Sequence, residues 1–229
     1  MGHVVSNEGI PLDLKNIKAI MEWTIPRNVG KVKSSMGLES CYRWFIGNFS
    51  LISYHITSLQ AKGKNFEWTK ECETLFEQVK HFLKNSPVLK IADPNKEFMV
   101  CTNVCKEGLG GVLMQEGQFV CYESRNLNEH ERNYAMHDLE LEIIIHELEM
   151  WRHYLLGRRF ILMTDHIGMR YLFNQPNLNS RKAKWLAILC KFYFGIRYIK
   201  GKDNKVGNAL NTGMHVNHIS AVSSYGTDL

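Results

Sequence analysis

Residues 98–122 read FMVCTNVCKEGLGGVLMQEGQFVCY and decide the fold that the sequence predicts. Three short apolar runs in this stretch are typical of strands: 98–102, 112–114 and 119–122. The pair Glu116-Gly117 between the last two runs predicts a tight hairpin. The glycine-rich segment Lys106–Gly111 predicts a turn after the first run. The stretch therefore indicates three consecutive antiparallel strands.

The chain after residue 122 alternates between helical and strand patterns. Apolar residues recur with a 3.6-residue period over 137–156, which predicts the longest helix of the chain. Shorter patterns predict the remaining elements: strands at 160–163 and 194–199, and helical segments at 167–173, 182–192 and 206–210. Three meandering strands followed by helical crossovers predict an α/β (α+β) fold, with a mixed five-stranded sheet and flanking helices.

Residues 1–90 predict a short strand at 3–5 followed by several short helices. Asp13 is expected to cap one helix, and Thr69 to open a second one that ends before Pro87. We therefore expect three parts along the chain: a mostly helical region at 1–90, a sheet-bearing domain at 91–212, and a flexible tail at 213–229 that is rich in Ser, Gly and His.

Composition narrows the class of protein. With 229 residues, 45% of them hydrophobic and 22% charged, the chain is neither collagen-like nor disordered. It has no apolar run near the roughly 20 residues that cross a bilayer, and no secretory signal is visible, so we expect an intracellular protein of the cytoplasm or nucleus. The six cysteines are then expected to be free thiols. A net charge of +5 permits nucleic acid as a partner.

Two carboxylates stand where ligands gather in a mixed sheet. Asp165 follows the fourth predicted strand, and Glu140 lies near the start of the long helix, where the helix dipole favours an anion. For each residue an ordinary structural role is the alternative: Asp165 would cap the next helix, and Glu140 would be a solvated helix residue.

Several stretches resemble gypsy-type long-terminal-repeat retrotransposon polyproteins, especially those of plants. Two resemble the ribonuclease H domain: YESRNLNEHERNYAMHDLELEIIIHELEMWRHYLLGRRFILMTDH at 122–166 and KFYFGIRYIKGKDNKVGNALN at 191–211. Two more are similar to the end of the reverse-transcriptase palm and the thumb: GHVVSNEGI at 2–10 and MEWTIPRNVGKVKSSMGLESCYRWFIGNFS at 21–50. NFEWTKECETLFEQVKHFLKNSPVLKIADP at 65–94 resembles the joining segment. The resemblance implies a ribonuclease H-like sheet domain, preceded by a thumb-like helical region, in a fragment of such a polyprotein.

In that family four carboxylates hold two divalent ions, usually Mg²⁺ (or Mn²⁺), which cut the RNA strand of an RNA–DNA hybrid. The resemblance places the second and third carboxylates at Glu140, in DLEL, and Asp165, in TDH. It places the first at Asn103, in TNVC, and the fourth at Asn208, in VGNALNT. Two of the four catalytic, metal-ligating positions therefore carry an amide in this chain.

Replacing two carboxylates by amides removes two of the negative charges that offset two dications. One well-placed electrostatic group is worth about 3 kcal/mol of transition-state stabilisation, so we expect the inherited hydrolysis of RNA in hybrids to be impaired. The alternative is a non-catalytic nucleic-acid-binding relic. In the family, the paired metal-binding aspartates of the polymerase precede the segment that this chain resembles, so we expect no polymerisation by the chain alone.

Basic residues recur beside aromatic ones, and the resemblance implies that several follow the phosphates of a hybrid. The candidates are Arg158, Arg159, Arg181, Lys182, Lys184, Lys200 and Lys202. The alternative is an ordinary solvated helix face. Loss of metal ligands does not by itself abolish phosphate binding, so an RNA–DNA hybrid or another nucleic acid is the expected partner in either case. The sequence leaves the oligomeric state open.

Overall fold

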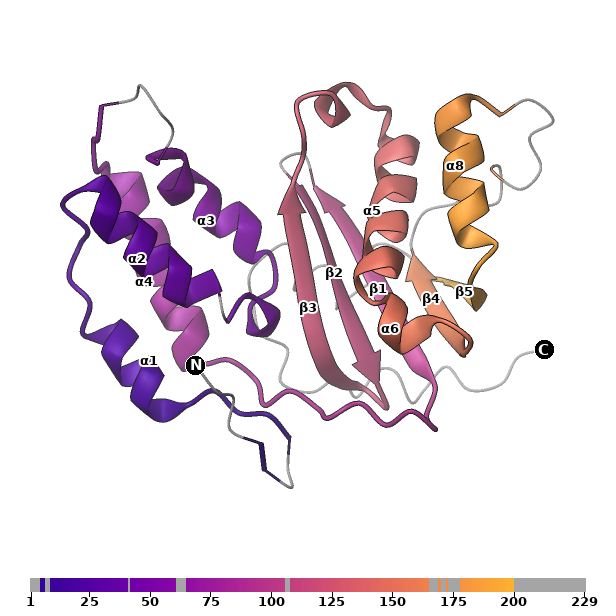
Figure 1. The fold of residues 1–229 in the computed structure, drawn as a ribbon, viewed down its shortest axis with the longest axis horizontal. Coiled ribbons are helices and arrows are strands. Elements are labelled where there is room, and N and C mark those ends of the chain that lie inside the picture. Colours follow the sequence, from indigo (N-terminus) through magenta and orange to yellow (C-terminus); the bar gives the residue numbers. More distant parts are fainter. Residues whose placement is uncertain are drawn as a thin grey trace.

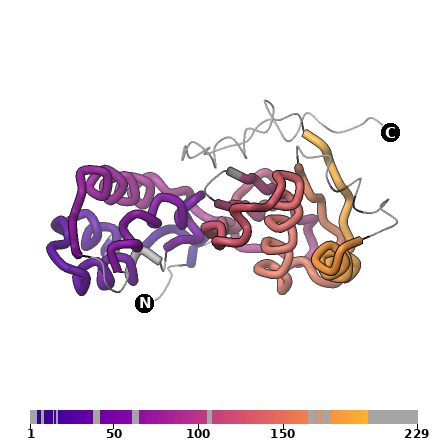
Figure 2. The backbone as a smooth tube through the Cα atoms, turned by 90° about the horizontal axis from the view of Figure 1, so that it is seen from above, coloured from indigo at the N-terminus to yellow at the C-terminus, as the bar shows by residue number. Residues whose placement is uncertain are grey.

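The computed structural model describes residues 5–6, 9–40, 42–60, 65–105, 108–164, 169, 172 and 178–199. Its elements follow in chain order: α1 (Leu14–Met21), α2 (Val29–Ser40), η1 (Arg43–Phe45), α3 (Phe49–Ser58), α4 (Lys70–Lys84), β1 (Phe98–Cys105), β2 (Gly108–Gln115), β3 (Gln118–Asn126), η2 (Glu131–Asn133), α5 (Met136–Met150), α6 (Arg152–Leu155), β4 (Arg159–Thr164), α8 (Ser180–Leu189) and β5 (Tyr193–Tyr198). The helices α1 to α4 lie beside the sheet-bearing part, as Figures 1 and 2 show.

The five strands form one mixed sheet in the order β3-β2-β1-β4-β5. β1, β2 and β3 pair antiparallel, whereas β4 lies parallel to β1 and β5 parallel to β4. This arrangement confirms the predicted mixed sheet with flanking helices. The hairpin between β2 and β3 is confirmed as well, because Glu116 and Gly117 both have positive φ, of 53° and 76°.

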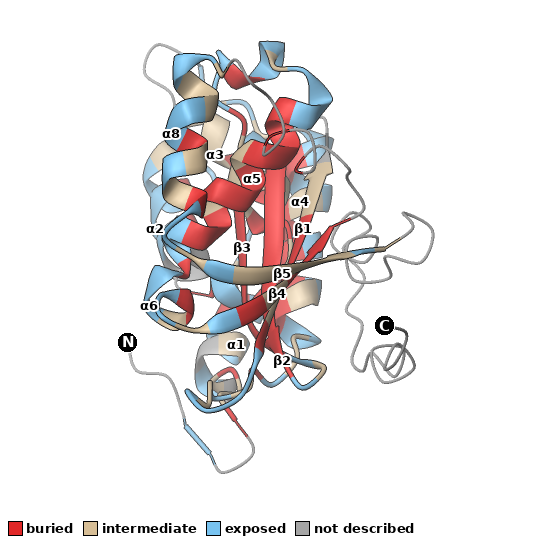
Figure 3. Ribbon diagram, turned by 90° about the vertical axis from the view of Figure 1, so that its right-hand side faces the viewer, coloured by how far each residue is buried: buried red, intermediate tan, exposed pale blue. Residues whose placement is uncertain are grey.

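The sheet is covered differently on its two faces. α5 packs on β1 and β2, and it is buried along most of its length (Figure 3). Gly111 faces this helix, since a Cβ placed on it would lie 2.7 Å from Glu147 Cδ. Gly110 faces the opposite side, where the same test meets Asn48 Oδ1 at 2.5 Å. Successive residues of a strand point to opposite faces, so α5 and the start of α3 lie on the two sides of β2.

The helical region joins the sheet through a shared hydrophobic core. One cluster of buried side chains contains residues of α1 to α4 together with Cys101, Val112 and Met163 of the sheet. Two hydrogen bonds reinforce the junction: Ser50 donates its backbone N–H to Ser124 Oγ (3.0 Å) and its hydroxyl to the carbonyl of Ser124 (2.6 Å). α3 is thereby fixed against β3.

The two predicted helix caps are confirmed. Asp13 precedes α1 and accepts a hydrogen bond from the backbone N–H of Lys15 at 2.9 Å. Thr69 precedes α4 and accepts one from Cys72 at 3.3 Å. Each side chain satisfies one of the backbone donors that a helix start leaves unpaired.

Three predicted elements differ from the structure. Gly108–Gly111 belongs to β2 and not to the predicted turn. Its three glycines allow other segments to pack closely against the strand, where a larger side chain would clash. The long helix predicted for 137–156 ends at Met150, and α6 follows after Trp151, whose ψ of 16° leaves the helical region while its ring stays buried. The helix predicted for 182–192 starts earlier, at Ser180, since Asn179 caps it.

The predicted helical segments 167–173 and 206–210 lie wholly or largely outside the described residues, as do residues 3 and 4 of the first predicted strand. Among the helices of the described ranges, none is long and apolar enough to cross a membrane.

Candidate functional site

The carboxyl ends of β1 and β4 meet at one edge of the sheet because these two strands are parallel. Asn103 lies near the end of β1, and Thr164 is the last residue of β4. α5 begins at this same edge, so Glu140 lies close to it along the chain. Asp165 directly follows Thr164 in the sequence, but Asp165 and Asn208 both lie outside the described residues. The structure therefore places two of the four predicted positions.

Asn103 is half-buried and pairs with Gly110 across the β1–β2 ladder. Directly paired residues share a face of the sheet, so Asn103 points to the side on which Asn48 packs against Gly110. Its neighbours Val100 and Val104 pack with α5 on the other face. The Asn103 side chain consequently lies on the face opposite to the one that α5, the helix of Glu140, covers.

Glu140 is buried, with 8% of its surface exposed, in the second turn of α5. The alternative that it is a solvated helix residue is therefore wrong. Placing a carboxylate near a helix start is electrostatically favourable, because the first backbone N–H groups carry partial positive charge. Ala135 provides no side-chain cap to this helix, so the N-terminal electrostatics of α5 depend on the acidic residues of its first two turns.

Two predicted nucleic-acid-binding residues hold helices together. Arg181 Nη2 forms a short ion pair with Asp138 Oδ2, and Lys182 Nζ lies 3.5 Å from Asp138 Oδ1. The Arg181 guanidinium also stacks 3.9 Å from the Tyr134 ring centroid and 5.1 Å from that of Trp185. These contacts hold the start of α8 against the start of α5. The Asp138 carboxylate also offsets the positive charges of Arg181 and Lys182, which are then less available to bind the phosphates of a nucleic acid.

The other predicted basic residues are spread over the molecule. Arg158 and Arg159 lie at the amino end of β4, which is the sheet edge opposite to Asn103. Arg158 donates a hydrogen bond to the carbonyl of Tyr154 at 2.9 Å. Lys184 is exposed on α8. Lys200 and Lys202 lie outside the described residues.

A charged network that the sequence did not reveal links β3, η2 and α5. Arg125 forms a bidentate pair with Glu131, at 2.6 and 2.9 Å, and also binds Glu142 at 2.9 Å. Trp185 Nε1 donates to the second oxygen of Glu142 at 3.1 Å. Burial opposes ionisation of Glu131, but the hydrogen bonds from Arg125 and from the backbone of Asn128 outweigh it and lower the pKa of Glu131 to about 2.

A second group missed by sequence reasoning is buried between β2, β3 and α5. Glu147 is fully buried, and neither of its carboxyl oxygens has a hydrogen-bond partner among the described residues. Burial and the nearby Glu123 carboxylate raise the pKa of Glu147 well above its ordinary value. Burial lowers the pKa of the adjacent His146 to about 4. One signal was available: Glu147 follows Ile144 by three residues and precedes Trp151 by four, which places it on the apolar stripe of the helix.

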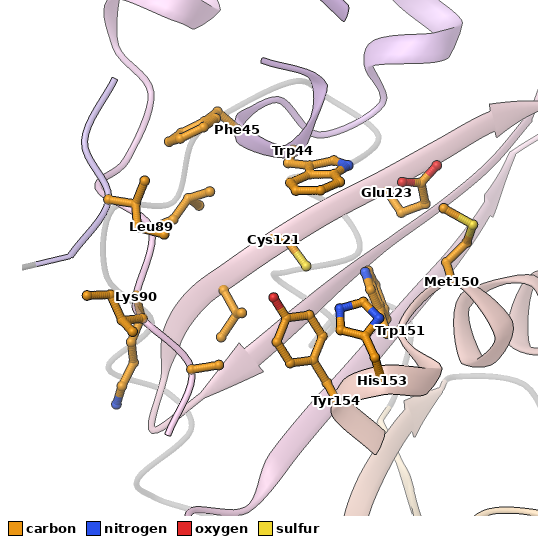
Figure 4. A pocket seen from close by; sticks show the side chains of 14 residues that line it. Trp44, Phe45, Leu89, Lys90, Cys121, Glu123, Met150, Trp151, His153 and Tyr154 are labelled. Atoms are coloured by element: carbon orange, nitrogen blue, oxygen red, sulfur yellow. The ribbon is translucent and has the colours of Figure 1, made fainter. Parts of the chain in front are cut away.

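A pocket of about 300 Å³ opens where η1, β3, the α5–α6 junction and residues 89–92 meet (Figure 4). Trp44, Trp151, His153 and Tyr154 provide flat side chains to its wall. Burial raises the pKa of Glu123, whose carboxylate is also in the wall, and the Arg43 charge partly offsets this effect. The sequence alone did not indicate this pocket, because its residues come from five separate segments.

The described residues include no group of three or more His, Cys, Asp or Glu side chains that could hold a metal ion. Near the carboxyl ends of β1 and β4, the amide of Asn103 and the carboxylate of Glu140 are the oxygen groups of the four predicted positions that lie within the described residues.

Comparison with known proteins identifies relatives of both parts of the chain. Residues 68–162 match the family described as an RNase H-like domain found in reverse transcriptase. Over its whole length the chain is 34% identical to the retrovirus-related Pol polyprotein from transposon 297 of Drosophila melanogaster, of which it covers 22%. It is 32% identical, over 92% of its length, to the corresponding polyprotein from transposon gypsy of the same species, and again covers 22% of it. The chain thus spans about a fifth of these curated relatives.

Among solved structures, the foamy viral protease–reverse transcriptase in complex with an RNA/DNA hybrid has a similar fold, with a TM-score of 0.77 and 24% identity. The match covers 88% of this chain and 29% of that one. The sheet order, the flanking helices and this likeness together show that the fold is ribonuclease H-like.

Proposed function

We propose that this chain is a segment of a gypsy-type, plant-like retrotransposon polymerase that binds RNA–DNA hybrids and hydrolyses them poorly or not at all. In this proposal residues 1–90 are the end of the reverse-transcriptase palm with the thumb and connecting region, residues 91–212 the ribonuclease H-like domain, and residues 213–229 a tail. The similarity to retrotransposon Pol polyproteins along the whole chain supports the assignment to such a polyprotein. We place its action inside the cell, where both strands of a hybrid are available.

The observation that carries the proposal is the amide of Asn103 near the carboxyl end of β1. The resemblance assigns a carboxylate to this position and another to Asn208. With Glu140 and Asp165 retained, the four side chains carry two negative charges toward the four positive charges of two dications. Neutral amide oxygens bind Mg²⁺ without offsetting ion–ion repulsion, so this donor set does not fit a two-metal centre.

Binding does not require the missing carboxylates. The exposed Lys184 on α8 follows Arg181 by three residues and Lys182 by two, and those two residues are engaged by Asp138. We therefore expect Lys184, together with Lys200 and Lys202, to contribute more to phosphate binding than Arg181 and Lys182 do. Arg158 and Arg159 lie at the other sheet edge and would contact a hybrid only if it extended across the domain.

The test combines cleavage and binding. The purified chain and the double variant Asn103→Asp/Asn208→Asp are incubated with a labelled RNA–DNA hybrid in Mg²⁺ or Mn²⁺, and hybrid binding is measured in parallel. We expect binding by both proteins, and cleavage by the double variant alone. Cleavage at a comparable rate by the unaltered chain would contradict the loss of hydrolysis, and failure to bind the hybrid would contradict the binding role.

Hydrolysis by the chain as it stands is the second candidate function. The burial of Glu140 at the start of α5 favours it, because this retained carboxylate is held by the fold rather than free in solvent. The variant Glu140→Gln distinguishes the two candidates: it abolishes any cleavage that depends on this carboxylate, while hybrid binding that rests on lysine–phosphate contacts persists.

A further inference from the structure

The pocket between the helical region and the sheet is separate from the edge that carries Asn103 and Glu140. Met150, which lines it, is at the other end of α5, about 15 Å from Glu140 along the helix at a rise of about 1.5 Å per residue. A volume of about 300 Å³ is at the lower end of the range for small-molecule sites. Any ligand of this pocket would therefore bind away from the candidate metal-binding positions.

Flat side chains stand on two sides of this pocket. Trp44 lies on one side, and Trp151, His153 and Tyr154 lie on the other (Figure 4). Trp44 is 48% exposed and lines the pocket, so part of its indole ring is accessible to a ligand. Aromatic side chains arranged in this way provide stacking surfaces for a planar ring.

Glu123 supplies the polar recognition group. Its side chain is only 5% exposed. Arg43 Nη2 lies 3.9 Å from Glu123 Oε2, and His146 Nε2 lies 4.0 Å from Glu123 Oε1, so neither contact is a hydrogen bond. The backbone of Ser124 contributes one hydrogen bond. Since a carboxylate has about four lone-pair sites, Glu123 keeps acceptor capacity on both oxygens.

The charges around the pocket select among planar ligands. The Lys90 ammonium is already paired with Glu116, so Arg43 is the cation that approaches Glu123. A neutral ring that carries an anionic tail suits both the Glu123 carboxylate and the Arg43 guanidinium. Nucleotides have this combination of a neutral base and a phosphate.

We propose that the pocket binds an unpaired guanine base, stacked against Trp44 and held on its Watson–Crick edge by Glu123. Guanine places two adjacent donors, N1–H and the N2 amino group, opposite the two carboxylate oxygens. Adenine and cytosine place a ring-nitrogen lone pair beside their amino group, and uracil flanks its single N–H with carbonyls. The source of the base is either a free nucleotide or an unpaired position of a nucleic-acid strand; the latter source rests on the proposed function above.

Calorimetric titration with guanosine, inosine and adenosine monophosphates tests the edge recognition. We expect guanosine monophosphate to bind about tenfold more tightly than adenosine monophosphate, with inosine monophosphate, which lacks the N2 amino group, between them. Glu123→Gln should remove this preference, because the new amide presents a donor to the base donors. Trp44→Ala should weaken all three by about tenfold through lost stacking.

Tyr54→Ala is the matched control: Tyr54 is also an exposed aromatic residue of the helical region, but it does not line the pocket. It should leave guanosine monophosphate affinity unchanged. Equal, measurable affinity for guanosine and adenosine monophosphates, or an unchanged guanine preference in Glu123→Gln, would overturn the proposal. Cooperative thermal unfolding of each variant establishes that it folds.

Two uridine-rich RNA strands, one with a single guanine and one without, identify the source of the base. Tighter binding of the guanine-containing strand indicates an unpaired strand position, whereas binding of the free nucleotide alone indicates a nucleotide site; either result supports guanine recognition. Hybrid binding measured on the same samples tests the proposed function separately. A chain that binds the hybrid and no form of guanine refutes this inference and leaves the proposed function standing.

Discussion

Replacing Glu147 by Gln should change how the stability of this protein depends on pH. The Glu147 carboxyl is fully buried, and burial followed by the charge of Glu123 raises its pKa well above the ordinary 4.5. Above pH 4.5 the unfolded chain loses this proton while the folded chain keeps it, so the free energy of unfolding falls as pH rises. The slope is about 1.4 kcal/mol per pH unit until the folded carboxyl also ionises. Glu147→Gln removes this contribution.

The assay is urea unfolding of the unaltered protein and of Glu147→Gln from about pH 5 to about pH 8. The difference in unfolding free energy should grow in favour of the variant as pH rises. The titrations of His146 and Glu123 are present in both proteins and largely cancel in this difference. Glu149→Gln is the matched control, because Glu149 is exposed on the same helix and its replacement should leave the profile unchanged. Parallel profiles for the unaltered protein and Glu147→Gln would refute the assignment of a neutral buried carboxyl.

Three further perturbations test the packing around the sheet. Gly111→Ala alone should destabilise the protein by about 1–3 kcal/mol, since the new Cβ would lie 2.7 Å from Glu147 Cδ; thermal unfolding should show that adding Glu147→Ala recovers part of this loss, and strict additivity would contradict the contact. Glu131→Gln should cost about 2–3 kcal/mol above pH 4.5, and this difference should vanish on acidification toward the folded pKa of about 2, because the stabilisation of a carboxylate with a lowered pKa is lost there. Arg181→Ala removes the ion pair with Asp138, so it should lower the free energy of unfolding by about 1–2 kcal/mol and speed proteolysis near the start of α8. An unchanged melting temperature would show that this pair does not hold the helix in place.

Local chemistry made several elements predictable. Glu116-Gly117 predicted the β2–β3 hairpin because a two-residue turn needs positive φ, and Asp13 and Thr69 predicted helix starts because their side chains satisfy free backbone donors. These features depend on neighbours in the sequence. A reader of the chain can therefore locate them without knowing the tertiary structure.

Other features depend on contacts between distant segments. The glycines of β2 resembled a turn, since the reason for their small size is the approach of Leu51, Asn48 and Glu147 from elsewhere in the chain. The periodicity of the long helix continues past Trp151, so the break there left no mark in the pattern. The four candidate metal-binding positions came from resemblance to a family, and Asn103 and Glu140 are the two of them that lie within the described residues.

The glycines of β2 also determine where this chain can be divided. Gly108 meets Leu51, and Gly110 meets Asn48, so one strand of the sheet is shaped to receive the start of α3. A shorter piece beginning after residue 90 would expose this hollow and the apolar side chains around it to water. The two parts therefore share one buried surface, and a variant that separates them would need polar residues in place of the apolar side chains that this surface now covers.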